Sequence, residues 1–250
     1  AIQMNVFFGV SYYFYQSVKQ HVQGVKLWVV RLCPITAAMT VMAASSRGAQ
    51  LALVVQAYFV FLHGKVSFKS IASIVVVLGA MYYVLPEEQL QRFESSGEDR
   101  TSLQRLLYWE HGLDMMVDHP FLGVGYFNFS NYYNEHFSED LYYESAELPH
   151  NIFVQVGADL GFIGLFVYFV LIWYGFRLPV RIRSRLIEQG CVDDWRIPIS
   201  KGLAIGFLGF LVAGQFVSVV YYPFMWIHLA MCTALLNSTH EANGVTISKR

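Results

Sequence analysis

The sequence predicts an all-α polytopic membrane protein, a helical bundle with one long polar loop on its outer side. Two observations support this fold class. Hydrophobic residues make up 55% of the 250 residues and charged residues only 14%, a composition that suits lipid better than water. The apolar residues also gather in runs that approach the length of a membrane-spanning helix.

Seven apolar runs are candidates for these helices. Backbone in lipid must satisfy its own hydrogen bonds, and a helix does this within one segment. Crossing a bilayer takes about 20 residues, so the third and the last run are short for a complete span. The runs cover residues 2–17, 27–44, 48–62, 69–85, 151–174, 203–222 and 224–237.

The basic residues predict the orientation of the runs, because Lys and Arg beside spans favour the cytoplasmic side. They gather between the first and second, the third and fourth, and the fifth and sixth runs. We therefore expect about four helices in 1–85, an acidic outer loop at 86–149 and about three helices in 150–237. The basic loop at 175–202 and the tail at 238–250 are then cytoplasmic.

The outer loop contains a predicted amphipathic helix that rests on the membrane domain. Thr101 and Gln104 form a capping-box pattern at its start, and Pro120 stops it after His119. Apolar residues recur between these points near helical spacing. The residues that give this spacing and form the apolar face are Leu103, Leu106, Leu107, Leu113, Met116 and Val117.

Glycine and aromatic residues follow this helix. Gly123 and Gly125 suit a tight turn. The stretch 126–143 is rich in Tyr, Phe and Asn, and aromatic rings favour the interface, where they contact carbohydrate or lipid headgroups. We expect this stretch to line an interfacial groove.

Arg47 lies between two apolar runs at the predicted outer surface, where it breaks the positive-inside pattern. One interpretation is an interfacial arginine that reaches for headgroups. The other is an anion site, in which the neighbouring serines and a helix beginning at Gly48 help Arg47 to bind phosphate oxygens. The sequence leaves both interpretations open.

Arg105 lies one helical turn before Trp109, so the two side chains share a face of the predicted helix. Stacking of the guanidinium on the indole is a sufficient structural explanation for this pair. Alternatively, Arg105 supplies a second guanidinium to the same outer anion site.

His150 stands with Asn151 at the start of the fifth run, where backbone N–H groups point outward. It is either a helix cap or a base near a reacting group. Asp159 lies about two turns into the same run, and a carboxylate is costly in lipid, so we expect it to face protein or a wet cavity. Gly161 and Gly164 beside it allow close helix packing.

The rest of the composition narrows the function classes. The net charge of −1 says little about partners, because basic and acidic residues are sorted into different loops, but no part of the sequence predicts nucleic-acid binding. Cys33, Cys191 and Cys232 show neither metal-ligand spacing nor a disulfide framework, so no metal and no cofactor is indicated. The chain begins at Ala1 with an apolar run and no signal-peptide pattern, so we expect it to be part of a longer protein.

Several of these motifs occur together in one known family. They are Ser46-Arg47-Gly48, Arg105 with Trp109, DHPFLGVG at 118–125, Pro149-His150-Asn151 and DLGFIG at 159–164. On these motifs the chain resembles the O-antigen ligase and O-antigen polymerase superfamily over roughly residues 40–175. The family more often has Glu where this chain has Asp159.

The resemblance implies a GT-C-like bundle of about a dozen helices in the bacterial inner membrane, with a long periplasmic loop. It implies a metal-independent, inverting glycosyltransferase that takes a glycan from a polyprenyl-diphosphate carrier at the periplasmic face. His150 then matches the histidine near the acceptor, and Arg47 and Arg105 match the arginines on the diphosphate. The supporting residues are Asn151, Asp159 and Trp109.

Two other functions stay open. A polymerase of O-antigen or exopolysaccharide repeat units would use the same motifs with a glycan as acceptor, whereas a ligase would use the lipid A core or a protein. A transporter of anions or inorganic carbon would use Arg47 and Arg105 to bind a small anion. Ligation is favoured, because the set of two arginines and one histidine matches the ligase branch.

Overall fold

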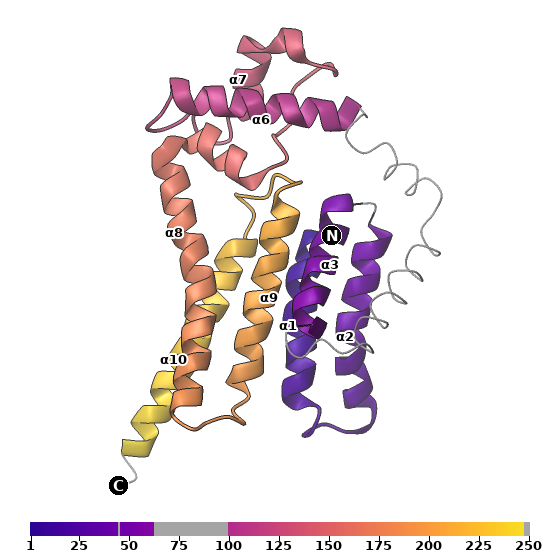
Figure 1. The fold of residues 1–250 in the computed structure, drawn as a ribbon, viewed down its shortest axis with the longest axis vertical. Coiled ribbons are helices and arrows are strands. Elements are labelled where there is room, and N and C mark those ends of the chain that lie inside the picture. The colour runs from indigo at the N-terminus through magenta and orange to yellow at the C-terminus, as the bar shows by residue number, and fades with distance from the viewer. Residues whose placement is uncertain (45, 63–99, 248–250) are drawn as a thin grey trace. The chain divides into compact units, whose positions relative to one another are not determined.

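A computed structural model describes residues 1–44, 46–62 and 100–247, and all regular secondary structure within these ranges is helical, as predicted (Figure 1). It comprises eight α-helices and one short 3-10 helix. These elements are α1 (Ile2–Val18), α2 (Gly24–Ala43), α3 (Arg47–Leu62), α6 (Arg100–Asp118), α7 (Phe129–His136), η1 (Ser138–Asp140), α8 (Ile152–Glu188), α9 (Arg196–Gly214) and α10 (Phe224–Ile247).

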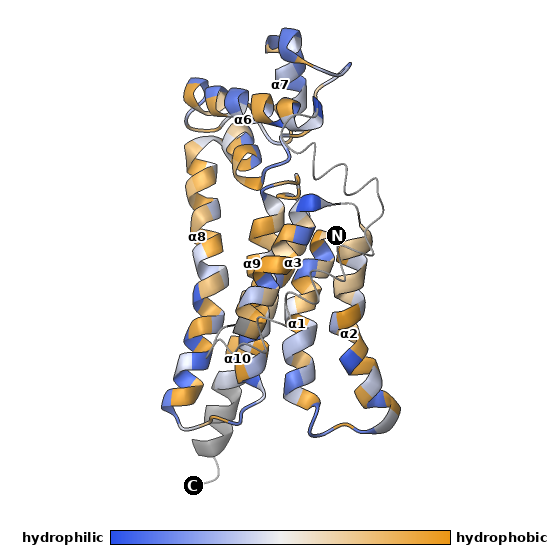
Figure 2. Ribbon diagram, turned by 45° about the vertical axis from the view of Figure 1, so that its right-hand side comes forward, coloured by the Kyte–Doolittle hydropathy of each residue, from blue (hydrophilic) through white to orange (hydrophobic). Residues whose placement is uncertain are grey.

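Among the described helices, α2, α8 and α9 are long and apolar enough to cross a membrane, and α3 is a shorter apolar helix. Figure 2 shows hydrophobic residues along much of their length. These three helices therefore agree with the prediction of membrane-spanning helices in length and composition. The total of seven spans stays a prediction, and the run at 69–85 lies outside the described residues.

Several helices extend beyond the apolar runs. Helix α8 continues from the fifth run to Glu188, and α9 begins at Arg196 and ends at Gly214, several residues earlier at each end than the sixth run. Helix α10 continues past the last run to Ile247. Polar residues are compatible with helix at these ends, so apolarity marks the spans better than it marks the helix bounds.

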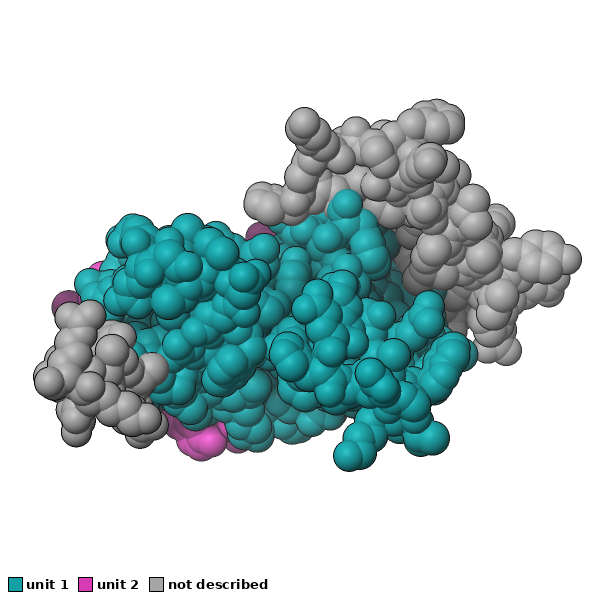
Figure 3. Space-filling model, turned by 90° about the horizontal axis from the view of Figure 1, so that it is seen from below, with its two compact units in different colours: residues 1–78, 172–213, 222–250 teal, residues 79–171, 214–221 magenta. Residues whose placement is uncertain are grey.

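The chain forms two compact units, which are coloured separately in Figure 3. Unit 1 contains residues 1–78, 172–213 and 222–250, and unit 2 contains residues 79–171 and 214–221. Helix α8 contributes its first part to unit 2 and its remainder to unit 1.

Within unit 1, α1 packs beside α2 and α3 (Figure 1). Its Gly9 meets α9 so closely that a Cβ atom there would lie 2.5 Å from the backbone nitrogen of Gly206. Small residues allow such backbone contact between helices in lipid. The amide of Gln56 joins the same helices, because Nε2 donates to the carbonyl oxygens of Asn5 (2.8 Å) and Ile205 (2.9 Å).

Unit 2 has an aromatic core between α6 and α7. Tyr108 of α6 makes edge-to-face contacts with Phe129 and Tyr133 of α7, at ring-centroid distances of 5.8 and 4.9 Å. On another side, α6 packs on the first turns of α8, where Gly112 is adjacent to Val154. Helix α6 is thus the central element of this unit.

The structure confirms the helix predicted in the outer loop but corrects its details. Thr101 lies inside α6 and so is not its N-cap, and Gln104 Oε1 accepts a hydrogen bond from the backbone of Tyr142 at 2.6 Å. The capping-box prediction was therefore wrong, because both side chains bind the loop at 142–143.

The six apolar residues that predicted this amphipathic helix differ in exposure. Of these, Met116 is buried, Leu107 is half-buried and the others are exposed. The buried side instead follows Gln104, Tyr108, Gly112 and Met115. Helical spacing identifies an apolar row, but it does not reveal which of two apolar rows contacts protein.

Candidate functional site

His150 occupies the loop just before α8 in unit 2. Its backbone has a positive φ of 53°, uncommon for a residue with a side chain. Two contacts hold it: the backbone N–H donates to Ser218 Oγ at 2.8 Å, and imidazole Nε2 lies 3.0 Å from Glu147 Oε2. The side chains of His150 and Glu147 are 24% and 73% exposed, so a solute can reach this pair.

Asn151 is the N-cap of α8. Its Oδ1 accepts hydrogen bonds from the backbone N–H groups of Phe153 (2.9 Å) and Val154 (3.2 Å), and its Nδ2 donates to Gln215 Oε1 at 3.3 Å. The interpretation of His150 as the cap was therefore wrong. The capping role belongs to Asn151, which leaves the histidine imidazole for other contacts.

Two aromatic residues of α6 hold the loop that carries His150. The indole N–H of Trp109 donates to the carbonyl oxygen of Pro149 at 2.8 Å. The hydroxyl of Tyr108 accepts a hydrogen bond from the backbone of Glu147 at 2.9 Å. Burial raises the pKa of Tyr108 above its ordinary value, so this hydroxyl keeps its proton.

These contacts link Arg105 to the histidine loop. Arg105 is half-buried on α6, one turn before Trp109, whose indole is bonded to the residue preceding His150. Arg105 and His150 thus lie in the same unit. The helix that carries Arg105 and the loop that carries His150 are joined by this hydrogen bond.

Asp159 is fully buried and faces protein, as predicted. Its Oδ1 accepts a hydrogen bond from the backbone of Phe129 at 3.0 Å, and its Oδ2 accepts one from the hydroxyl of Tyr221 at 2.9 Å. Phe127, two residues before the N–H group of Phe129, has a positive φ of 55°.

The glycines around Asp159 allow close contact between backbones. Gly123, with a φ of 65°, passes so near α8 that a Cβ atom would lie 2.3 Å from the carbonyl oxygen of Ala158. Gly161 interrupts the helical backbone of α8 with a φ of 66°. The predicted turn at Gly123 and Gly125 is thus confirmed. Gly161 contacts the backbone of Phe121 and Gly123 in the connection before α7, and the atoms nearest to Gly164 belong to Leu160 of its own helix, so the close helix packing predicted for these two glycines is not observed among the described residues.

Arg47 belongs to unit 1, whereas the other five predicted site residues belong to unit 2. It is the first residue of α3, so the helix begins one residue before the expected Gly48. Ser46 Oγ accepts a hydrogen bond from the backbone of Ala49 at 3.4 Å. The helix start at Arg47 is thus capped by a serine.

The sequence did not indicate Glu147, Ser218 and Tyr221. Glu147 precedes His150 by three residues, a spacing that was available as a signal. The other two lie in the connection between α9 and α10, and no local pattern relates them to the loop before α8. Over residues 1–44, 46–62 and 100–247, no three His, Cys, Asp or Glu side chains are grouped to hold a metal ion.

Comparison with known protein families identifies the chain. A family model described as O-antigen ligase matches residues 32–169, more than half of the sequence. The chain belongs to the O-antigen ligase family. The region matched to this O-antigen ligase family contains all six predicted site residues, from Arg47 to Asp159. Comparison with curated proteins and with solved structures gives no match.

Proposed function

We propose that this member of the O-antigen ligase family transfers a glycan from a polyprenyl-diphosphate carrier to an acceptor hydroxyl. The family supports the reaction type. The observation that carries the proposal is the state of His150, whose imidazole is accessible and paired with Glu147, while Asn151 takes the capping role.

His150 acts as the base in this proposal. An ionised carboxylate only accepts hydrogen bonds, so in contact with Glu147 the Nε2 atom carries a proton. In the neutral imidazole, Nδ1 then holds the lone pair. Nδ1 takes the proton of the acceptor hydroxyl while its oxygen attacks the anomeric carbon from the side opposite the diphosphate.

Arg47 and Arg105 stabilise the leaving group. The bond between the anomeric carbon and the diphosphate oxygen breaks with inversion, and the bonding electrons stay on the diphosphate. Guanidinium groups bind phosphate oxygens in bidentate fashion and oppose this developing charge. The role of fixed cations, and hence the independence from metal, rests on the family resemblance.

The cellular location and the architecture are inferred from the same family. We propose a GT-C-like bundle in the bacterial inner membrane, with residues 86–149 as a periplasmic loop and the reaction at the periplasmic face. The acceptor of a ligase is the lipid A core or a protein. A polymerase would instead transfer the glycan of one lipid-linked donor to a second lipid-linked glycan of repeat units.

Glycan transfer by full-length protein in proteoliposomes tests the assignment of His150. With a purified lipid-linked glycan and acceptor, His150→Ala is expected to lower the transfer rate by about 100-fold or more. The matched control is His136→Ala, since His136 is exposed on α7 and bonded only locally, to the carbonyl oxygen of Tyr132. Wild-type transfer by His150→Ala would refute the base assignment.

Deleting the gene separates the two kinds of transfer. Loss of a ligase leaves long lipid-linked chains, and loss of a polymerase leaves single lipid-linked repeats. We expect long chains. Uptake of labelled bicarbonate by the same proteoliposomes, without glycan transfer, would overturn the proposal in favour of an anion transporter.

A further inference from the structure

Helix α6 has a second apolar side, opposite the core of unit 2. Leu106, Leu113 and Val117 follow this side at helical spacing, and they are 54%, 57% and 69% exposed. The core is contacted by the other side, through residues such as Tyr108 and Met115. We call Leu106, Leu113 and Val117 the apolar row of α6.

A row of carboxylates runs beside the apolar row. Glu110, Asp114 and Asp118 are exposed and follow each other at intervals of four residues, which places them along one line on the helix. We call them the acidic row. The exposed half of α6 is therefore divided lengthwise into an apolar and an acidic strip, the pattern of a helix that lies in a membrane interface.

The apolar surface continues past the end of α6. Phe121 and Leu122 are 71% and 75% exposed. The adjacent carbonyl oxygen of Pro120 accepts a hydrogen bond from the backbone of Phe162 in α8 at 2.8 Å. This bond fixes the end of α6 to a defined level of α8.

At that level the exposed apolar surface of α8 begins. Helix α8 is long and apolar enough to cross a membrane. Its large exposed apolar side chains in unit 2 all come at or after the contact with Pro120. They are Phe162, Ile163, Phe166, Val167 and Phe169. The exposed residues at the end of α6 are thus continuous with the surface that a spanning helix presents to acyl chains.

We propose that the apolar row, together with Phe121 and Leu122, inserts into one leaflet of the bilayer. Helix α6 then lies along the membrane surface with its acidic row toward water. The occupant is lipid, because Phe121 and Leu122 adjoin the exposed apolar surface of a membrane-spanning helix. Insertion also fixes the depth of Trp109 and of the loop it holds.

Spin labels on cysteines along α6 test this placement. Full-length protein with Cys33, Cys191 and Cys232 replaced by Ala is reconstituted in vesicles of phosphatidylethanolamine and phosphatidylglycerol. Labels replace Leu106, Leu113 and Val117, and the matched control labels replace Asp114 and Asp118 on the same helix. Collisions with oxygen report acyl chains, and collisions with a water-soluble nickel chelate report water.

Labels in the apolar row are expected to show a several-fold higher ratio of oxygen to nickel collisions than labels in the acidic row. Equal nickel access in both rows would overturn the proposal in favour of a water-exposed helix. Low access to both reagents in the apolar row would overturn it in favour of a protein contact. Circular dichroism and gel filtration show whether each labelled variant is folded. The measurement needs no glycan, so its outcome is independent of the proposed reaction.

Discussion

The pair of His150 and Glu147 combines an exposed carboxylate with an imidazole held at its backbone by Ser218. The backbone contact with Ser218 and the capping of α8 by Asn151 fix the position of the His150 backbone, from which the imidazole extends. Glu147 then selects which nitrogen carries the proton. In the proposed reaction it therefore positions the base without contacting the substrate.

Glu147→Gln is expected to lower the kcat of glycan transfer, though by less than His150→Ala. The glutamine amide can both donate and accept, so it no longer fixes the imidazole tautomer. KM is expected to change little, because no substrate contact is lost. The control is Glu144→Gln, an exposed carboxylate in the same loop. Equal rates for the two variants would contradict the positioning role of Glu147.

Asp159 ties together residues that are distant in sequence, through the backbone of Phe129 and the hydroxyl of Tyr221. Asp159→Asn is expected to lower the free energy of unfolding by about 2 kcal/mol, because it removes charge-assisted hydrogen bonds to a buried group. Tyr221→Phe removes one bond and is expected to cost about 1 kcal/mol.

The unfolding of these variants is measured by heating the purified protein in detergent. Asp118→Asn, on the exposed side of α6, serves as the control for loss of a carboxylate charge. Asp159 does not organise this part of the chain if its variant unfolds at the same temperature as the control.

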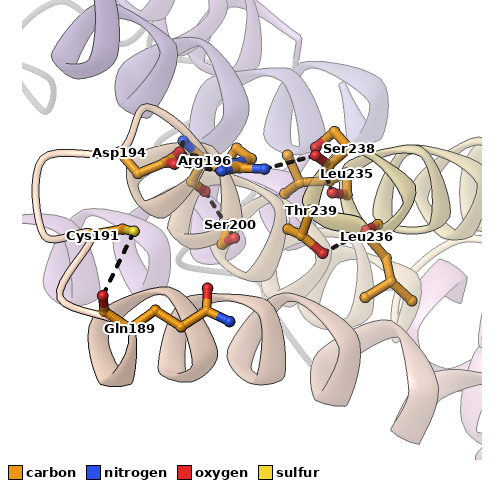
Figure 4. A network of polar contacts seen from close by, with 9 residues as sticks. All are labelled: Gln189, Cys191, Asp194, Arg196, Ser200, Leu235, Leu236, Ser238 and Thr239. Carbon is orange, nitrogen blue, oxygen red and sulfur yellow. Dashed lines mark hydrogen bonds and ion pairs between the residues drawn. The ribbon is translucent and has the colours of Figure 1, made fainter. Parts of the chain in front are cut away.

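At the scale of elements, the connection between α8 and α9 is held by one ion pair (Figure 4). Arg196 Nη2 lies 2.6 Å from Asp194 Oδ2, and Arg196 Nη1 donates to the carbonyl oxygen of Ser238 in α10 at 2.7 Å. Arg196 thereby links the start of α9 to α10. The hydrogen bond from Arg196 is the main reason that the pKa of Asp194 lies below its ordinary value of 3.8.

This ion pair predicts a dependence of stability on pH. Because the pKa of Asp194 is lowered by folding, its contribution is fully present above pH 3.8 and is lost as the pH falls through the lowered value. Asp194→Asn is expected to lower the unfolding temperature at pH 7 but not at a pH below the lowered pKa of Asp194. Asp193→Asn, an exposed neighbour, is expected to change neither. An equal effect of Asp194→Asn at both pH values would contradict the prediction.

At the scale of the whole molecule, the proposed reaction assigns the binding of the diphosphate to Arg47 and Arg105. Arg47→Ala and Arg105→Ala are each expected to lower the transfer rate by about 10- to 100-fold. This is the effect on the rate of losing a charge-assisted hydrogen bond of about 1.5–3 kcal/mol. If both arginines stabilise one leaving group, the double variant departs from the product of the single effects.

Arg31 provides the comparison for this double-mutant cycle. It is an exposed arginine of unit 1 whose guanidinium lies 5.3 Å from the ring of Trp28. Arg31→Ala combined with Arg105→Ala is expected to give the product of the single effects. Strict additivity of Arg47→Ala with Arg105→Ala would show that the two arginines do not share a phosphate group.

The sequence by itself determined the helical membrane fold, the family and the burial of Asp159. Composition, run length and the intolerance of lipid for a carboxylate are properties of local segments, so they can be read along the chain. The turn at Gly123 and Gly125 was predictable for the same reason, since the positive φ values there suit glycine.

Only the tertiary structure decided which groups meet. Trp109 bonds to a residue 40 positions away, and Asp159 to one 62 positions away. It also decided that the apolar row of α6 faces outward and that Asn151 caps α8 in place of His150. Both outcomes depend on the neighbouring elements. Helix α6 has two apolar sides, and either side could contact protein until packing selects one. The loop before α8 has two polar residues, His150 and Asn151, and either could cap the helix.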